Sequence, residues 1–456
     1  MLGAILQKFS EKSPVTVMVH GLLERLLAKE KIDEWFNTNC QVQYTRHILF
    51  SSLVYLMLHV VCRIRNSVHA AYRHSDFVRN SVVAVYNKLK GVETQTSAGI
   101  VRYIAGEAES IIREMNGTHL PWVPGYQVRL LDGNCIEKTE HRLQVLRGTK
   151  AGALPGKSLV VFDPEVELAI NVFPCEDAYT QERALLDQVL ETVQPKEIWI
   201  ADRNFCVQDF LWGIHDKGAY FVIRHHQNMP YKPLSEEKFV GNSATGRVFE
   251  QSVELSSSGG QTYEARRLVV YLKDPTRDGE KTIAMFTNLP PEVVDGLHVA
   301  ELYRHRWGIE NAFQKLEKYF HSEINTLGYP KAALFGFCLA LVAFNVYAVV
   351  MAALRAAYPD EAINDEISDY YIAEEISATY TGMVLIVEDQ EWTVFRDGST
   401  QEVSQLLIDF ALKIELWRFK KSKRGPKKPA KPKNQFVGKP HVSTARLLAR
   451  KDCATA

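Results

Sequence analysis

The chain has 456 residues, a length that suggests about three domains. Hydrophobic residues make up 46% of it, which is enough for packed cores and excludes wholesale disorder. The formal net charge is zero, so charge alone does not indicate a nucleic-acid partner or a membrane partner. Seven scattered cysteines without a CxxC pair argue against a structural zinc site or a disulfide framework, and favour a reducing compartment.

The balanced charge is segregated along the chain. Residues 359–410 hold thirteen acidic residues and one basic residue, whereas residues 418–456 hold thirteen basic residues and one acidic residue. The prolines and lysines of the basic tail cannot build a core, so we predict that residues 418–456 are disordered in the free protein. Local charge is therefore more informative than the total.

Residues 1–120 are predicted to be helical, because apolar residues recur at helical spacing over residues 17–36 and 47–64. Thr96 and Ser97 are candidate N-caps for a helix that runs to about Met115. The stretch 61–90 is basic, and Gly91 after it separates two short helical patterns, which would suit a helix-turn-helix. A solvated helix face explains the basic stretch equally well. Its basic residues are Arg63, Arg65, Arg73, Arg79, Lys88 and Lys90.

From about residue 126 the pattern changes to short β runs that alternate with helices, which predicts an α/β sheet. The expected strands are 128–134, 158–163, 167–173, 197–202 and 220–226, with helices at 178–193 and 205–218. Residues 227–282 break the alternation and predict a β-rich insertion with turns at Ser257–Gly260 and Asp278–Gly279. A further strand at 282–290 leads into a long helix that begins near Val299.

Residues 332–354 are apolar except for Asn345. Their length would permit a membrane span, but this is a lone segment and small residues interrupt its hydrophobicity. We therefore predict a buried core helix.

Two aspartates follow apolar runs of the predicted sheet, Asp132 in LLDGN and Asp202 in EIWIADRNF. Ligands and catalytic groups collect at the carboxyl ends of strands in α/β sheets. Two carboxylates brought together there repel each other unless cations intervene, and oxygen ligands suit Mg²⁺ or Mn²⁺ rather than zinc. Either aspartate alone is more often a helix cap or a turn residue.

A third carboxylate lies in the predicted helix ELYRHRWGIENAFQKLEKYF. Its residues Tyr303, Arg306, Trp307 and Glu310 are spaced to share one helix face. This combination suits nucleic acid, because arginine binds phosphate, tryptophan stacks on a base and glutamate binds metal. An amphipathic helix with a surface salt bridge between Arg306 and Glu310 is the simpler alternative.

Together these residues resemble the bacterial DDE transposases of the insertion sequence 4 family, whose signature is a Tyr-Arg-Glu-Lys helix. The resemblance covers roughly residues 126–355, and DAYTQERALL, ADRNF and FTNLP support it in order and spacing. The signature lysine departs from the pattern, because Glu317 stands at its position between Lys315 and Lys318. Lys318 is the candidate that would contact the DNA phosphate that the signature lysine contacts in the family.

The resemblance implies an α/β fold with a ribonuclease H-like catalytic core, interrupted by a β-rich insertion and preceded by an N-terminal helical domain. The corresponding division is a helical DNA-binding domain at 1–120, core at 121–226, insertion at 227–282, core at 283–358, an acidic region at 359–417 and a basic tail at 418–456. Asp132, Asp202 and Glu310 would hold two Mg²⁺ ions, or Mn²⁺, and cleave DNA at the ends of an insertion sequence before joining them to target DNA.

The partners implied are double-stranded DNA, as terminal inverted repeats and as target, and a second copy of the chain in a synaptic homodimer. No membrane partner is expected, and the location implied is the bacterial cytoplasm at the nucleoid. Tyr303, Arg306, Trp307 and Lys318 would contact DNA near the cleavage site. Arg63, Arg65, Arg73, Lys88 and Lys90 are candidates for binding the terminal repeats.

Two other functions stay open, a DNA-binding protein derived from a transposase without catalysis, and a nuclease on the same fold that cuts but does not join. His225 and His226 are adjacent at a strand end and point to opposite faces, so ordinary structural roles are expected for them. The basic tail would add a salt-sensitive contribution to DNA binding, or serve only as a solubilising end. We expect the acidic segment to fold near the tail and compete with non-specific DNA.

Overall fold

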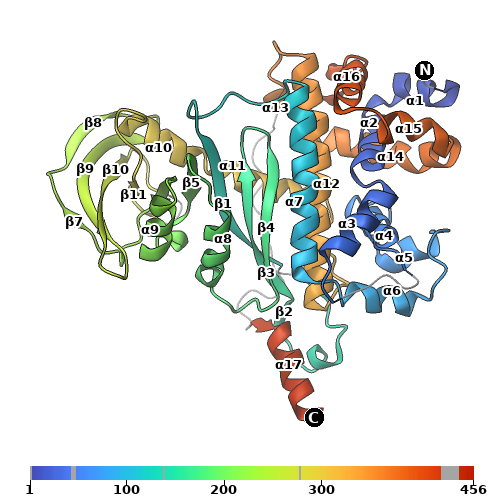
Figure 1. Ribbon diagram of the computed structural model, residues 1–456, viewed down its shortest axis with the longest axis horizontal. Coiled ribbons are helices and arrows are strands. Elements are labelled where there is room, and N and C mark those ends of the chain that lie inside the picture. The colour runs from blue at the N-terminus through green and yellow to red at the C-terminus, as the bar shows by residue number, and fades with distance from the viewer. Residues whose placement is uncertain (1–2, 43–47, 137–138, 277–278, 423–440, 456) are drawn as a thin grey trace.

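A computed structural model describes residues 3–42, 48–136, 139–276, 279–422 and 441–455. A large mixed sheet lies beside a layer of helices (Figure 1). The strands of the sheet lie in the order β4-β3-β1-β5-β6-β11-β10-β9-β7, and β8 pairs with β9. Their bounds are β1 Gln127–Ile136, β3 Gly156–Asp163, β4 Leu168–Cys175, β5 Glu197–Ala201, β6 Tyr220–Arg224, β7 Lys232–Pro233, β8 Lys238–Asn242, β9 Gly246–Ser256, β10 Thr262–Leu272 and β11 Thr282–Thr287.

Helices make up the described part of the N-terminal region, as predicted, and most of the region after the sheet. Before the sheet they are α1 Ala4–Lys12, α2 Pro14–Leu26, α3 Lys29–Asn39, α4 Phe50–Val61, α5 Val68–Arg73, α6 Val82–Leu89 and α7 Thr94–Glu114. Between and after the strands they are α8 Leu186–Thr192, α9 Gln208–Asp216, α10 Gly296–His305, α11 Trp307–Tyr319, α12 Pro330–Ala357, α13 Ile363–Glu366, α14 Asp369–Ile386, α15 Thr393–Arg396 and α16 Thr400–Ala411.

The strands that carry the candidate site form one half of the sheet. β1, β3 and β4 pair in antiparallel fashion, whereas β5 and β6 run parallel to β1. All residues of β5 are buried, as its continuous apolar run predicts for a strand covered on both faces. The predicted strands are confirmed, but the helix expected at 178–193 is shorter and α8 begins only at Leu186.

The β-rich stretch after β6 extends this sheet rather than forming a separate one. β11 pairs with β6, β10 with β11, and β9 with β10, each in antiparallel fashion. The predicted turn at Ser257–Gly260 is the connection between β9 and β10. The other predicted turn involves Asp278, which lies outside the described residues.

Helix α12 is the centre of the helical layer. Every residue of its most apolar window is buried inside the protein, which agrees with the prediction of a core helix although the segment is long and apolar enough to cross a membrane. Asn345, in its middle, is fully buried and bonds with both backbone groups of Ala169 on β4 at 2.9 Å each. The side-chain amide of Asn345 is therefore hydrogen-bonded despite its burial. Its partner lies where the register of the β3 and β4 pairing shifts.

Helix α7 packs against both β4 and α12, and Figure 1 shows α7 and α12 side by side. It begins at Thr94 with Glu93 as N-cap, so the prediction of Thr96 and Ser97 as caps is wrong; both are buried inside the helix. The end at Met115 is confirmed. Helix α7 has 21 residues and packs one face against β4 and α12, so it is longer than the short second helix that the helix-turn-helix hypothesis supposed.

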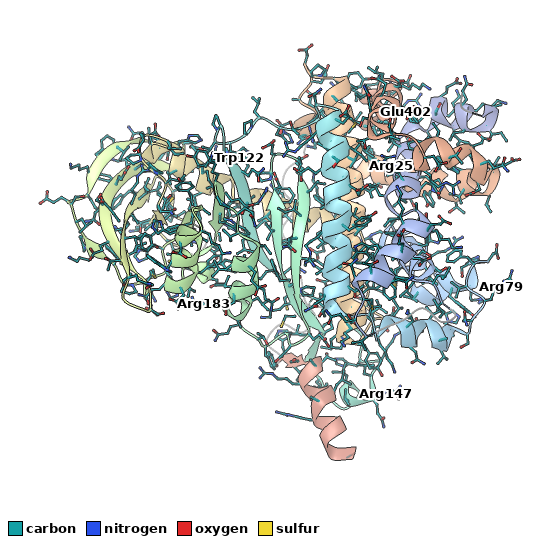
Figure 2. All side chains as sticks on the ribbon, viewed as in Figure 1. Arg25, Arg79, Trp122, Arg147, Arg183 and Glu402 are labelled. Carbon is teal, nitrogen blue, oxygen red and sulfur yellow. The ribbon has the colours of Figure 1, made fainter. Side chains whose placement is uncertain are left out.

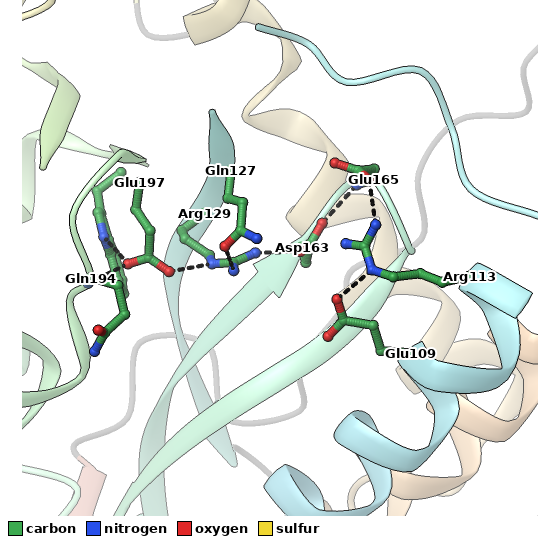
Figure 3. A network of polar contacts seen from close by, with 9 residues as sticks. Glu109, Arg113, Gln127, Arg129, Asp163, Glu165, Gln194 and Glu197 are labelled. Carbon is green, nitrogen blue, oxygen red and sulfur yellow. Dashed lines mark hydrogen bonds and ion pairs between the residues drawn. The ribbon is translucent and has the colours of Figure 1, made fainter. Parts of the chain in front are cut away.

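A buried polar network joins three strands near the beginnings of β1 and β5 (Figure 3). Arg129 donates to Glu197 at 2.8 Å, to Gln127 at 2.7 Å, and also to Asp163. These three partners come from β5, β1 and β3, so one guanidinium satisfies charges that would be costly to bury alone. The network lies at one end of the β1 and β5 pair, and the two predicted catalytic aspartates lie at the other end.

The acidic segment forms α13–α16 and contacts α2, α7 and α12, so it is part of the packed helical layer. The first residues of the basic tail contact it, because Lys420 pairs with Glu366 at 2.7 Å and Lys421 donates to the backbone oxygen of Asn364 at 2.8 Å. Residues 423–440 of the tail lie outside the described residues, and the prediction of disorder is wrong for residues 441–455, which form a strand and a helix. Beyond them, β12 (His441–Ser443) pairs with β2 (Gly152–Leu154), and α17 (Thr444–Thr455) follows.

Candidate active site

Asp132 and Asp202 lie on neighbouring strands at equivalent positions. The parallel pairing of β1 with β5 ends at the Leu131 and Ala201 pair, and each aspartate is the next residue in the chain. Asp202 follows β5 directly, as predicted. Asp132 does not end its strand, because β1 continues to Ile136 through antiparallel pairing with β3. The carboxylate therefore stands where β1 loses its parallel neighbour but keeps its antiparallel one.

Glu310 reaches the sheet from α11, which lies across β1. Asp132 and Leu130 share one face of β1, since side chains alternate along a strand. Gly308 of α11 lies over Leu130, and a β-carbon added to this glycine would stand 3.6 Å from the leucine side chain. This close approach places the first turn of α11, with Glu310, beside Asp132.

The helix expected from about Val299 through Glu310 is interrupted. Helix α10 runs from Gly296 to His305, so it starts before Val299. Helix α11 starts at Trp307, and Arg306 is the single residue between the two helices. Its N–H bonds to the carbonyl of Tyr303 at 3.1 Å, which is a tighter turn than the α-helical pattern. The prediction of one continuous helix is therefore wrong at this residue.

Arg306 bridges two of the three predicted catalytic carboxylates. Its Nη1 lies 3.2 Å from Oδ2 of Asp132, and its Nη2 lies 2.6 Å from Oε1 of Glu310. The expected pair with Glu310 exists, but it is not a surface salt bridge, because Arg306 is only 7% exposed. The guanidinium also lies over the ring of Tyr303, 5.9 Å from its centroid.

The electrostatics of this site reflect burial and crowding of like charges. Burial raises the pKa of Asp132 to about 6, Glu310 and Asp202 add to the shift, and Arg306 and the Gly133 amide oppose it. Burial also raises the pKa of the Tyr303 phenol to about 12, so this side chain remains a neutral hydrogen-bonding group. Burial and the neighbouring carboxylates therefore make the charged form of Asp132 costly, and Arg306 offsets part of that cost.

Asp202 has an oxygen that the protein leaves unsatisfied. Its Oδ1 is buried without a hydrogen-bond partner among the described residues, and its nearest cation is Arg224 of β6 at 4.0 Å. Arg224 is itself held by Glu280, which also pairs with Arg203 at 2.9 Å. The hydrogen bond from Arg224 lowers the pKa of Glu280, so this carboxylate stays charged between the two arginines.

Arg224 and Glu280 were not predicted from the sequence. Arg224 ends the apolar run YFVIRHH on the strand beside β5, so the strand-end argument that selected Asp202 would also have selected it. Glu280 lies in the connection before β11, and no sequence signal marks it. His225 follows Arg224, and burial lowers its pKa to about 4, as expected for a structural imidazole.

The four residues of the predicted signature face do not share one environment. Tyr303 and Arg306 are buried, whereas Trp307 is 56% exposed. The indole of Trp307 is therefore exposed to solvent, unlike the buried ring of Tyr303. Trp307 directly follows Arg306 in the chain. An exposed indole on a rigid helix is suited to stacking on a base.

A groove with a cavity volume of about 750 Å³ lies along α11, and residues between Gly308 and Tyr319 line one side of it. Aromatic rings and lysines line it, including Trp122, Tyr319, Tyr370, Lys315, Lys318 and Lys421. Lys315 pairs with Asp369 at 3.2 Å, whereas the ammonium of the exposed Lys318 bonds to the phenol oxygen of Tyr319 at 2.7 Å. Lys318 therefore remains the candidate for the signature lysine. Figure 2 places Trp122 on the upper side of the sheet half.

The basic residues of 61–90 are dispersed over several elements of the helical half, and Figure 2 shows Arg79 at its outer edge. Arg63 contacts the signature region, because it donates to the backbone oxygen of Glu317 at 3.0 Å. Lys88 lies over the ring of Phe36 and Lys90 over that of Tyr329. Arg65 is half-buried and Arg73 is exposed.

Within the described residues, no group of three or more His, Cys, Asp or Glu side chains is placed to hold a metal ion. The donor set nevertheless suits a hard divalent cation, because all three predicted ligands offer carboxylate oxygens. The unsatisfied buried Oδ1 of Asp202 points the same way. Arg306 supplies the positive charge between Asp132 and Glu310 in this arrangement.

Residues 123–346 match the family model described as transposase DDE domain. The matched range contains Asp132, Asp202 and Glu310, and it ends within α12. This match suggests transposase activity on DNA. A search of curated proteins finds no significant match to the chain.

Proposed function

We propose that the protein is a transposase of the insertion sequence 4 type, which cleaves DNA at the ends of an insertion sequence and joins them to target DNA. The observation that supports the proposal is that Arg306 bridges Asp132 and Glu310, while Asp202 follows the strand beside that of Asp132, inside the matched range. The strand order β4-β3-β1-β5-β6, with three antiparallel strands followed by two parallel ones, supports a ribonuclease H-like core. Strands β7–β10 correspond to the proposed insertion.

Asp132, Asp202 and Glu310 would hold two divalent ions, Mg²⁺ or Mn²⁺. Such ions activate water or a DNA 3′-hydroxyl as nucleophile and stabilise the leaving oxygen of a phosphodiester. The side chains contribute by position, since β1 and β5 fix the two aspartates through strand pairing and α11 fixes the glutamate over β1. No covalent bond between the protein and DNA is required in this scheme.

Several neighbouring groups would position the DNA. Arg306 offers a planar fork of donors that matches a phosphate, and Tyr303 offers a neutral phenol beside it. Trp307 would stack on a base displaced from the duplex, and Lys318 would neutralise a phosphate along α11. The helical region 1–120, with Arg63, Arg65, Arg73, Lys88 and Lys90, is the proposed binding region for terminal repeats.

The partners that follow are double-stranded DNA and a second copy of the chain, since two ends must be cut together. The proposed location is the bacterial cytoplasm, at the nucleoid. The test is Mg²⁺-dependent cleavage of DNA that carries the sequence flanking the gene, followed by detection of joined products. Cleavage without joined products would contradict transposase activity and leave a nuclease, and DNA binding without cleavage would leave a non-catalytic protein.

A further inference from the structure

The space between Asp132 and Glu310 holds a positive charge that belongs to the chain itself. Both terminal nitrogens of Arg306 are engaged there, one with each carboxylate, at 3.2 Å and 2.6 Å. A divalent ion shared by these carboxylates would compete with the guanidinium for one oxygen of each. It would also meet the repulsion of a fixed charge, which is strong at this range.

The guanidinium is held in this position by its surroundings. Arg306 lies in the break between α10 and α11, is 7% exposed, and packs against the buried ring of Tyr303. Burial alone would lower the pKa of Arg306, but Tyr303 and the Asp132 carboxylate raise it, so the side chain remains charged. A buried charge of this kind cannot leave its partners unless another anion replaces them.

One nitrogen of Arg306 has no partner in the described part of the chain and remains available for such an anion. Its Nε is buried and has no hydrogen-bond partner among the described residues. A phosphodiester could accept from Nε and from a terminal nitrogen together, which is the fork geometry that arginine offers to phosphate. When the guanidinium moves from the carboxylates to the phosphate, it exchanges one set of anionic partners for another. It is therefore paired with an anion both without DNA and with DNA bound.

We propose that Arg306 is the internal counter-cation of the free protein, and that a phosphodiester entering the site draws it away from Asp132 and Glu310, which then accept divalent ions. This inference rests on the proposed function, and it adds that metal loading and DNA binding are coupled. By linkage, divalent ions strengthen DNA binding by the same factor as DNA strengthens ion binding. A chain without DNA therefore carries few ions at this site.

The test is a titration of the full-length protein with Mn²⁺ in the absence of DNA, with free Mn²⁺ measured by electron paramagnetic resonance. Arg306→Met removes the charge and keeps the length of the side chain. We expect this variant to bind Mn²⁺ at least about tenfold more tightly than the unmodified protein, because even water-screened repulsion between a unit charge and a divalent ion is worth that factor. Equal or weaker binding by a folded Arg306→Met protein overturns the proposal.

Two further variants make the result specific. Arg304→Met removes an exposed arginine that pairs with Glu301, outside the carboxylate site, and should leave Mn²⁺ binding unchanged. Adding Asp132→Asn to Arg306→Met should abolish the gain. If the tighter binding persists without the Asp132 carboxylate, the ion sits elsewhere and the proposal is wrong.

Arg306→Lys covers the case in which Arg306→Met does not fold, as judged by circular dichroism. A single ammonium cannot occupy both guanidinium positions, so we expect Mn²⁺ to bind a few-fold more tightly, and unchanged binding overturns the proposal. Because no DNA is present, the outcome is independent of the cleavage assay. Tighter binding in the variants together with an absence of cleavage in the unmodified protein would refute the transposase proposal alone.

Discussion

Substituting Asn345 by alanine should destabilise the protein substantially. The asparagine is fully buried in α12, and its amide accepts from the Ala169 N–H and donates to the Ala169 carbonyl, both at 2.9 Å. Ala169 is itself buried in β4, where the pairing with β3 shifts register between Val161 and Phe162. Alanine would leave two buried backbone groups without partners.

The expected loss follows from the two unsatisfied groups. Each costs about 1–3 kcal/mol when its partner is removed in a buried position. We expect Asn345→Ala to lower the free energy of unfolding by about 3 kcal/mol, since some relaxation or a water molecule will offset part of the sum. Chemical denaturation followed by circular dichroism measures this difference, and hydrogen exchange at the Ala169 amide reports on the local bond.

The matched control is Asn87→Ala, which removes an exposed asparagine from α6. Surface substitutions of this kind usually change stability by less than about 0.5 kcal/mol. If Asn345→Ala costs less than about 1 kcal/mol and leaves exchange at Ala169 unchanged, the two hydrogen bonds do not hold β4 against α12, and the reasoning fails.

Three further predictions concern charge. Burial raises the pKa of Glu375 from 4.5 to about 7, so the stability linked to this group is complete below pH 4.5 and is lost as the pH rises through 7. Glu375→Gln should therefore stabilise the protein by on the order of 2 kcal/mol near pH 8 and by nothing near pH 4.5 in thermal unfolding; equal effects at both pH values would contradict this. Glu280→Gln should tighten non-specific DNA binding a few-fold and steepen its log–log salt dependence by about one unit, because two arginines lose their internal partner, whereas Glu264→Gln should change neither. Lys318→Gln should reduce the salt slope of DNA binding by about one unit. Lys315→Gln should instead lower the free energy of unfolding by up to about 1 kcal/mol, because its ion pair is lost. The reverse pattern would mean that Lys315 contacts DNA and Lys318 stabilises the fold.

Sequence patterns were sufficient to predict the elements whose structure depends on residues close together in the chain. The continuous apolar run before Asp202 predicted a fully buried strand, and the run around Asn345 predicted a buried helix, because burial on both sides removes polar alternation. Both predictions are confirmed. The spacing of Arg306 and Glu310 also predicted their contact, since residues four apart meet on a helix.

Long-range pairing decided what the sequence could not predict. Asp132 lies within β1 because β3 continues to pair beyond the point at which β5 ends, and no local signal in LLDGN records the length of a partner strand. The break at Arg306 has no proline or glycine at that residue to announce it. Its contact with Asp132 joins residues 174 positions apart, so helical periodicity could not reveal that one arginine bridges two carboxylates.

DNA cleavage by single carboxylate variants tests the central claim most directly. The account predicts that Asp132→Asn, Asp202→Asn and Glu310→Gln each abolish Mg²⁺-dependent cleavage of DNA carrying the flanking ends, while gel-shift binding to the same DNA is retained. Glu317→Gln, on the same helix as Glu310, is the matched control and should still cleave. Retained cleavage in any of the first three variants would contradict the assignment of these carboxylates as the catalytic site.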